Sequence, residues 1–440
     1  MKPYRRETRT LCPTCGELIP AVIVDDGAGL VMDARCPTCG PTKRPFAKDG
    51  DFHRAVEPFV DRHNERTQPD DFRGTCDFLR VARDLYIDGT ERCNFDCPIC
   101  YTNANTAPAP DLTLEEIFRG VDALPPGIVV SLLGGEPTLR KDLAAIVRHI
   151  ADRGHLVKLI TNGTRLTDER IDELHDAGLR WVVLQFDGFS DEIYLKTRGR
   201  RLVEERFAVI ERLAKRGMII VLASMIVPGV NDDQVGRILH YALCHPNIVQ
   251  IGFLPASNIG RNGIDDLEMG GFMRLLAEQT GGRVTADDFV RASRQGDRYT
   301  CLTGNLAYKS RTCVQGLFLY YDGYRPDDAA KSANGVAHPA ELHEGKTLVP
   351  IDRALLSAIA IRQPGRVAGA LAHIARWNRE PRHPHLFGVV IEKFRDRNAL
   401  DFDDAKNCTK VYLTRDGLIP NCLYNIQYRP RRHAHDHATA

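Results

Sequence analysis

The chain has 440 residues with 59 basic and 58 acidic side chains, so its formal charge is only +1. This balance argues against a general nucleic-acid binder, whose affinity rests on a large basic surplus. No run of about 18 apolar residues is present, which excludes a transmembrane helix. The start MKPYRRETRT lacks an apolar signal region, so we expect a cytoplasmic protein. Thirteen cysteines, several in C-x-x-C spacings, indicate metal binding rather than disulfides.

Residues 1–45 carry the first four cysteines. Cys12 and Cys15 lie in a CPTCG motif that is repeated with Cys36 and Cys39, and the runs LIPAVIV and LVMDA between the two copies predict a β-hairpin. Two such motifs around a hairpin predict a tetrahedral four-thiolate site, as in rubredoxins and zinc ribbons. Thiolate spacing does not distinguish zinc from a single iron. The metal is either a structural staple for a segment too short to fold alone, or a redox-active relay of electrons.

Residues 46–79 are polar and irregular, and we expect a linker there. From 80 to 265 the sequence alternates strand-like and helix-like stretches, typical of an α/β domain with a parallel sheet. The expected strands are Leu85–Asp88, Ile128–Leu133, Leu156–Thr161, Trp181–Phe186, Ile219–Met225 and Val249–Leu254. The expected helices lie near 113–124, 141–153, 167–177, 202–216 and 232–243. Periodicity does not decide between an open doubly wound sheet and most of a barrel.

Residues 266–430 are expected to form a less regular C-terminal domain, followed by a disordered basic and histidine-rich tail at 431–440. The spacing of four cysteines in this domain suits an auxiliary cubane cluster rather than a zinc ribbon, and scattered buried cysteines are the alternative. These four are Cys301, Cys313, Cys408 and Cys422. The apolar stretch 351–377 lines a lipid channel, rests on a membrane surface, or is an ordinary pair of core helices.

The three central cysteines carry the chemistry. Cys93, Cys97 and Cys100 lie on one loop directly after the first expected strand. Three thiolates hold three irons of a cubane and leave the fourth open, as catalysis requires, whereas a closed zinc site would be structural. The loop CNFDCPIC resembles the radical S-adenosylmethionine (SAM) superfamily. GGEP, TNG, QFDG and VPGVND follow the next four strands, at the sheet edge where α/β proteins bind ligands.

This resemblance implies a partial (β/α)6 barrel with a [4Fe-4S] cluster on the three cysteines. The reduced cluster cleaves bound SAM to a 5′-deoxyadenosyl radical, which abstracts a substrate hydrogen. A flavodoxin- or ferredoxin-type protein is the expected reductant. Glycines 134 and 135 are expected to let the backbone approach the ligand, and Glu136 to accept from the SAM amino group. The expected SAM contacts are Gly134, Gly135, Glu136, Pro137, Asn162, Gln185, Asp187 and Asn231. Ile99 departs from the family, where this residue is commonly aromatic.

The four N-terminal cysteines and the C-terminal DGLIPNCLYN are similar to one radical SAM branch. That branch contains archaeal tetraether lipid synthase and the class D, pterin-type methyltransferases. Two auxiliary clusters would need eight cysteines, and only six remain outside the two cysteine motifs already described, so we expect one auxiliary [4Fe-4S] cluster. Cys76 and Cys244 are then left over, Cys244 as a small core residue.

Three functions remain open from the sequence. The first is carbon–carbon bond formation or methylation at an unactivated carbon, with a small-molecule or lipid substrate and, for a lipid, peripheral membrane contact. The second is a radical SAM enzyme acting on a small polar substrate or a peptide. The third is a non-enzymatic zinc ribbon that docks on a partner. No nucleic-acid partner is expected from the charge.

Overall fold

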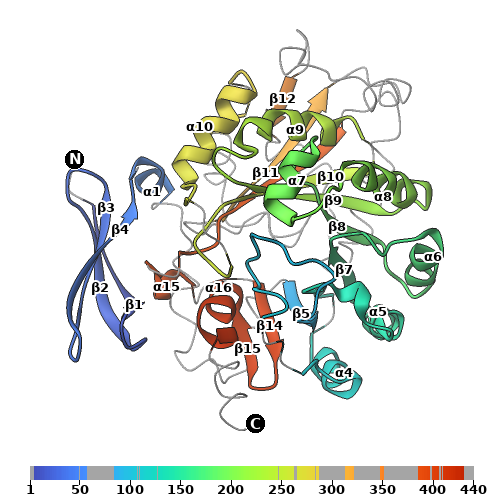
Figure 1. Cartoon of the computed structure of the whole chain (residues 1–440), viewed down its shortest axis with the longest axis horizontal. Coiled ribbons are helices and arrows are strands. Elements are labelled where there is room, and N and C mark those ends of the chain that lie inside the picture. Colours follow the sequence, from blue (N-terminus) through green and yellow to red (C-terminus); the bar gives the residue numbers. More distant parts are fainter. Residues whose placement is uncertain are drawn as a thin grey trace.

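The computed structural model describes residues 4–56, 84–286, 313–321, 347–350 and 385–430, with short gaps at 49, 107, 109, 126, 246, 262–264, 283, 397–398, 406–407 and 409. Two sheets organise these residues, a small antiparallel one near the N-terminus and a large mixed one that forms the body of the molecule (Figure 1). Cys76, Cys301, the stretch 351–377 and the tail 431–440 lie outside the described residues.

The N-terminal sheet has four antiparallel strands in chain order. They are β1 (Arg5–Leu11), β2 (Leu18–Asp25), β3 (Leu30–Cys36) and β4 (Gly40–Ala47). The predicted hairpin is confirmed as β2 and β3, whose buried Ile19, Ile23 and Met32 form the core of this domain. The outer strands were not predicted because RRETRTL and GPTKRPFA are rich in charge or proline and show no apolar alternation. A short helix, α1 (Asp51–Val56), occupies the start of the expected linker.

The large sheet contains all six predicted strands, paired in parallel with their neighbours. They are β5 (Asp84–Thr90), β6 (Val129–Gly134), β7 (Leu156–Thr161), β8 (Trp181–Gln185), β9 (Ile219–Ile226) and β10 (Ile248–Pro255). Alternate residues of these strands, such as Leu132, Leu159 and Val182, are buried in the apolar core beneath the helices that cover the outer face.

The C-terminal part extends this sheet at both ends. β13 (His385–Glu392) pairs in parallel with β10, and β14 (Lys410–Thr414) pairs in parallel with β5. An ion pair between Glu392 and Lys410 joins these two added strands. Because they extend opposite ends of the six-stranded core, the sheet must curl into a barrel rather than stay open. The predicted partial barrel is confirmed and the open alternative is wrong. The remaining strands are β11 (Cys313–Tyr321), β12 (Thr347–Pro350) and β15 (Gly417–Pro420), all antiparallel.

The five predicted helices are present, and α7 and α10 are additional. The longer helices are α4 (Leu114–Asp122), α5 (Leu143–Asp152), α6 (Asp168–Asp176), α7 (Asp191–Arg198), α8 (Val203–Lys215), α9 (Val235–Leu243) and α10 (Met269–Gln279). The short ones are η2 (Pro137–Leu139), η3 (Asp232–Gln234), α15 (Phe402–Ala405), α16 (Asn421–Leu423) and η6 (Tyr424–Tyr428). A capping box begins α4, in which the Thr113 and Glu116 side chains each accept from the other residue's backbone N–H. Within the described part of the chain, no helix has the length and apolarity needed to cross a membrane.

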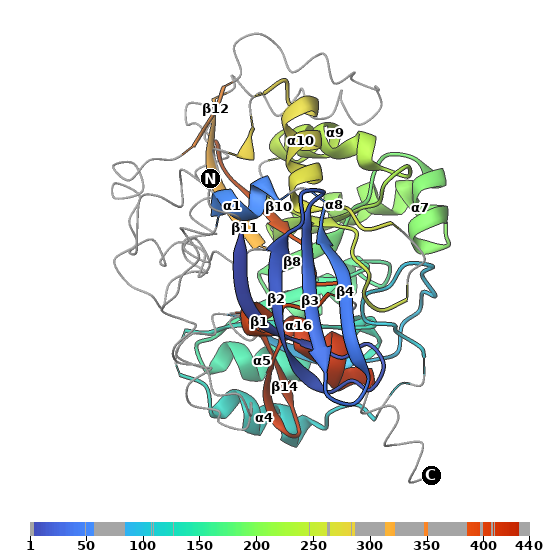
Figure 2. The same ribbon diagram turned by 90° about the vertical axis from the view of Figure 1, so that its left-hand side faces the viewer.

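The N-terminal sheet packs on the C-terminal segment beside the barrel (Figure 2). Thr8 of β1 donates to Asp401 with an Oγ1–Oδ1 distance of 2.6 Å, and Arg6 pairs with the same carboxylate. Arg9 Nε donates to Asp403 Oδ1 at 3.0 Å, and its guanidinium lies 5.1 Å from the ring centre of Phe402. These contacts tie the four-cysteine domain to α15, just before Cys408.

Candidate active site

A cavity of about 220 Å³ lies inside the barrel. Cys93, Cys97 and Cys100 line it at the carboxyl edge of the strands, while Lys158 and Trp181 line it nearer their amino ends. The site therefore extends along the barrel axis. The cysteine loop and the inward-facing side chains of seven strands together line this one cavity.

Two polar side chains outside the motif hold the cysteine loop in place. Asn105 Oδ1 accepts from the Cys93 N–H at 2.8 Å, and its Nδ2 donates to the Phe95 carbonyl at 3.0 Å. Arg261 pairs with Cys100 through two backbone hydrogen bonds, and its Nε donates to the Cys97 carbonyl at 3.0 Å. Sequence reasoning missed both residues. Asn105 has a positive φ of 66°, a backbone conformation that the fold imposes and that no sequence motif indicates.

The three thiols suit iron rather than a role as free cysteines. Burial, together with the nearby Glu136, Cys97 and Cys100, raises the pKa of Cys93 to about 12. Burial also raises the pKa of Cys97. The thiols of Cys93 and Cys97 would therefore stay protonated by themselves, whereas iron deprotonates its thiolate ligands and compensates their charge. The donor set fits a cluster held by three cysteines.

The glycine pair at the end of β6 makes a contact that the sequence did not predict, and its expected contact with SAM stays a prediction. A Cβ at Gly134 would lie 2.3 Å from the Thr90 carbonyl oxygen, and one at Gly135 would lie 2.2 Å from that of Arg92. The Gly135 N–H donates to the Thr90 carbonyl at 2.7 Å. Both glycines line the cavity, but they are required because the loop packs against the backbone that leads into the cysteine loop.

Glu136 lies fully buried beside the cavity and is not among its lining residues. Its Oε1 accepts from the Thr138 N–H, the Thr138 hydroxyl and the Thr161 hydroxyl, at 3.1, 2.6 and 2.6 Å. Its Oε2 accepts from the Asn162 N–H at 2.8 Å. Glu136 therefore ties η2 to the end of β7. One lone pair of Oε2 stays available for a further donor, so the expected SAM contact remains a prediction.

Replacing Glu136 by glutamine is expected to lower the free energy of unfolding by about 1–3 kcal/mol, because an amide N–H₂ would face groups that are themselves donors. Thermal unfolding of the anaerobic protein measures this loss. The control Glu204→Gln removes an exposed carboxylate on α8 and should leave the melting temperature close to that of the wild type. Equal melting temperatures for Glu136→Gln and the control would contradict the role assigned to these four hydrogen bonds.

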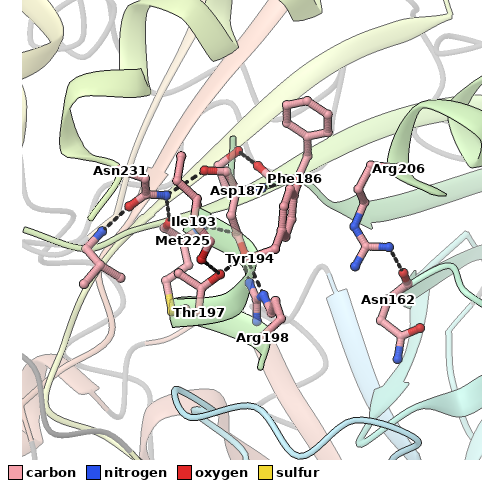
Figure 3. Close-up of polar contacts among 12 residues, drawn as sticks. Asn162, Phe186, Asp187, Ile193, Tyr194, Thr197, Arg198, Arg206, Met225 and Asn231 are labelled. Atoms are coloured by element: carbon pink, nitrogen blue, oxygen red, sulfur yellow. Dashed lines mark hydrogen bonds and ion pairs between the residues drawn. The ribbon is translucent and has the colours of Figure 1, made fainter. Parts of the chain in front are cut away.

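The Asp187 carboxylate forms an ion pair with Arg198 (Figure 3), and Arg198 rather than Asp187 lines the cavity. Its carboxylate accepts from Arg198 Nε at 2.6 Å and from Arg198 Nη2 at 3.0 Å, and it also accepts from Thr197 and the Met225 N–H. Burial alone would lower the pKa of Arg198, but Asp187 and Cys97 raise it, so the guanidinium stays charged. Arg198 lines the cavity near Cys97. Sequence reasoning missed it because it lies on the unpredicted helix α7.

The remaining predicted SAM residues divide into two groups. Asn162 and Gln185 line the cavity, and the buried Gln185 Oε1 has no hydrogen-bond partner among the described residues. Asn231 and Pro137 do not line it. Asn231 Nδ2 donates to the carbonyls of Asp187 and Met225, both at 2.7 Å (Figure 3). Asn231, in the loop after β9, therefore connects that loop to the loop after β8.

The four N-terminal cysteines converge on one point. The sulfur atoms of Cys12, Cys15, Cys36 and Cys39 lie within 4.8 Å of one another, with 3.7 Å between Cys15 and Cys36. Tetrahedral bonds of about 2.3 Å to zinc or iron would set the sulfurs roughly 3.8 Å apart. Backbone hydrogen bonds at Cys15 and Thr14 lower the pKa of Cys12 to about 6, which favours a thiolate. The predicted four-cysteine metal site is confirmed.

Three of the four predicted auxiliary ligands come near Glu392. Burial, together with the neighbouring Cys422 and Glu392, raises the pKa of Cys408 to about 12. The pKa of Cys422 is raised by burial and by the same Glu392. Cys313 begins β11 at the position whose Cα pairs with Glu392 on β13. The prediction for Cys301 falls outside the described residues.

Comparison with known proteins agrees with this geometry. Residues 87–242 match the radical SAM superfamily, and residues 4–48 match the HMPTM N-terminal zinc ribbon domain. The chain is 34% identical to a 7,8-dihydro-6-hydroxymethylpterin dimethyltransferase of Methanocaldococcus jannaschii, over 96% of this chain and 94% of the relative. It is 32% identical to a probable GTP 3′,8-cyclase of Pyrococcus abyssi, over 38% of this chain and 54% of the relative.

A crystal structure of Streptococcus suis SuiB bound to S-adenosylmethionine aligns with a TM-score of 0.39 at 18% identity, over 45% of this chain and 46% of SuiB. The near full-length match is the informative one. The chain belongs to the radical SAM superfamily, and within it to the family of the Methanocaldococcus dimethyltransferase. It is therefore a radical SAM enzyme that uses a [4Fe-4S] cluster and SAM, together with an N-terminal four-cysteine metal site.

Proposed function

We propose that the enzyme methylates a carbon atom of a small fused heterocycle of the dihydropterin type. The observation that carries this proposal is the 34% identity with the dihydropterin dimethyltransferase along almost the whole of both chains. The match includes the four-cysteine domain and the C-terminal part, which the cyclase match at 38% of this chain does not span. Between the two reactions considered from the sequence, this similarity favours methylation over the coupling of lipid chains.

Polar side chains set among the largely apolar residues of the cavity wall support a small polar substrate rather than a lipid. Lys158, Gln250, Glu392 and Lys410 line it together with aromatic side chains. An alkyl chain would leave buried polar atoms of the wall, such as Gln185 Oε1, without a hydrogen-bond partner among the described residues, which is costly in a buried site. The aromatic lining residues are Tyr86, Phe95, Tyr101, Trp181 and Phe394. Such faces suit a flat ring.

The residues that would hold the cofactors lie at the carboxyl edge of the strands. Cys93, Cys97 and Cys100 would bind the [4Fe-4S] cluster, and SAM bound there supplies a 5′-deoxyadenosyl radical when an electron arrives. We assign Gly134, Gly135, Asn162 and Gln185 to the SAM side of the cavity, as expected from the sequence. Arg198 joins them, because its guanidinium offers charge-assisted hydrogen bonds to a carboxylate such as that of SAM. The hydrogen bonds of Asp187, Asn231 and Glu136 hold the loops at this edge in position.

We assign the auxiliary [4Fe-4S] cluster to Cys301, Cys313, Cys408 and Cys422 in the C-terminal domain. The convergence near Glu392 supports three of these ligands. Leu11, next to Cys12, packs against the apolar cluster that contains Cys422. An iron at the four-cysteine site would therefore pass electrons toward the auxiliary cluster, whereas zinc at this site would only stabilise the fold. The external reductant is expected to be a flavodoxin- or ferredoxin-type protein.

Formation of 5′-deoxyadenosine by the reconstituted protein tests this function. With dithionite and SAM, 7,8-dihydro-6-hydroxymethylpterin is expected to raise the rate about tenfold above the uncoupled background, because substrate completes the site and excludes water. GTP, a fatty acid and an unrelated peptide serve as comparison compounds. Stimulation by GTP or by the fatty acid alone would contradict the proposal.

A further inference from the structure

A polar cluster lies deep in the barrel, away from the cysteine loop. The Lys158 ammonium of β7 pairs with the Asp84 carboxylate of β5, which also accepts from the Ser131 hydroxyl. The ammonium lies 5.0 Å from the centre of the Trp181 ring and 5.9 Å from that of Tyr86. Asp84 is 2% exposed and Trp181 is 5% exposed. We call Asp84, Ser131, Lys158 and Trp181 the barrel floor.

Two features of the floor suggest a ligand rather than a stabilising core. The indole N–H of Trp181 is buried and has no hydrogen-bond partner among the described residues. An orphaned buried donor is unfavourable, and a ligand acceptor would satisfy it. A buried ion pair is also poor evidence for stability, since apolar side chains of similar volume often serve as well. Both Lys158 and Trp181 line the cavity.

The floor lies at a suitable depth below the expected SAM site. Asn162, at the carboxyl edge of β7, is four residues beyond Lys158 along the chain. At about 3.3 Å per residue, the floor lies roughly 13 Å below that edge. A fused two-ring heterocycle fits within this depth, with one ring edge on the floor and the other end toward the cysteine loop.

The charges of the described cavity wall are balanced. The described lining carries the cations Lys158, Arg198 and Lys410, and each is paired with a carboxylate, of Asp84, Asp187 and Glu392 respectively. Phosphate groups are usually bound by cations in excess or by rows of backbone N–H groups. The balanced wall therefore suits an uncharged ring better than a phosphate ester.

Building on the proposed function, we propose that Trp181 and the Asp84–Lys158 pair form the recognition site for the hydrogen-bond-accepting edge of an uncharged fused heterocycle. The indole N–H and the ammonium donate to the ring carbonyl and ring nitrogen of the substrate. The Asp84 carboxylate neutralises the ammonium, so the same floor disfavours phosphorylated forms of that heterocycle.

Calorimetric titration of the reconstituted full chain with two probes tests this proposal. The probes are 7,8-dihydro-6-hydroxymethylpterin and its diphosphate ester. The wild type is expected to bind the free pterin at least about tenfold more tightly than the ester. Trp181→Phe keeps an aromatic ring but removes the indole N–H donor, so it should weaken pterin binding about three- to tenfold and leave SAM affinity unchanged. Tighter binding of the ester, or equal pterin affinity in Trp181→Phe, would overturn the assignment of the floor.

Asp84→Asn supplies a second, opposite test. It leaves the ammonium of Lys158 without its carboxylate and should shift the preference toward the diphosphate ester by roughly tenfold. An unchanged preference in a variant that still binds SAM normally would contradict the role of the pair. Failure of the wild type to bind either probe, with SAM binding intact, would instead overturn the proposed function on which the inference rests.

Discussion

Replacing Cys93, Cys97 and Cys100 together by alanine is expected to remove about four irons per chain and all formation of 5′-deoxyadenosine. The three thiols line one cavity, and Asn105 and Arg261 hold their loop from outside the motif. The fold should survive, because the barrel core lies below the loop. Iron analysis and chromatography of the SAM products after anaerobic reconstitution measure both losses.

The control for this variant is Cys244→Ala. Cys244 lies at the end of α9, its sulfur 3.7 Å from His240 Nε2. Its replacement should leave the iron content and SAM cleavage at wild-type levels. The assignment of the cluster would be wrong if the triple variant still formed 5′-deoxyadenosine, or if the control lost as much iron.

The second large effect is expected at the four-cysteine domain. Cys12→Ser with Cys36→Ser removes two ligands, and a structural site of this kind contributes on the order of 10 kcal/mol to folding. The small core around Ile19, Ile23 and Met32 is too limited to compensate for this loss. Residues 4–48 should therefore lose metal and become sensitive to protease, while the barrel stays folded.

Limited proteolysis followed by mass spectrometry locates this change. Arg9→Ala is the matched control, since it removes one docking contact to Asp403 and keeps all four ligands. That variant should retain its metal. A double-cysteine variant that keeps its metal and resists protease would contradict the assigned site. Comparing zinc-loaded with iron-loaded wild type then separates the two roles, because only an electron relay loses turnover with zinc.

The sequence predicted the barrel core well because each core strand is a local apolar run followed by a helix with its own pattern. The added strands β13 and β14 could not be predicted this way. They join the sheet through partners more than a hundred residues away, at β10 and β5. Helix α7 was missed because DEIYLKTR has a weak apolar pattern, although its Ile193 and Tyr194 are buried.

The same distinction between local patterns and long-range contacts applies to the residues of the candidate site. Cysteine ligands were predictable because C-x3-C-x2-C and paired CPTCG motifs place their thiols by local geometry. Side chains that act across the barrel were not, since the partners of Arg198 and Lys158 lie 11 and 74 residues away. Glu136 and Asp187 were predicted as SAM contacts; the described residues show both in hydrogen bonds within the chain, and their contact with SAM stays a prediction.

The most direct test of the account is the set of pterins extracted from a heterologous host that produces this enzyme, since the host supplies any methyl donor that the reaction needs. Mass spectrometry should find dihydropterin derivatives heavier by one or two CH₂ units in cells with the wild type. These should be absent from cells with Cys97→Ala, in which one cavity-lining thiol is missing. Identical pterins in both cell types, with the wild-type protein folded and loaded with iron, would contradict the account.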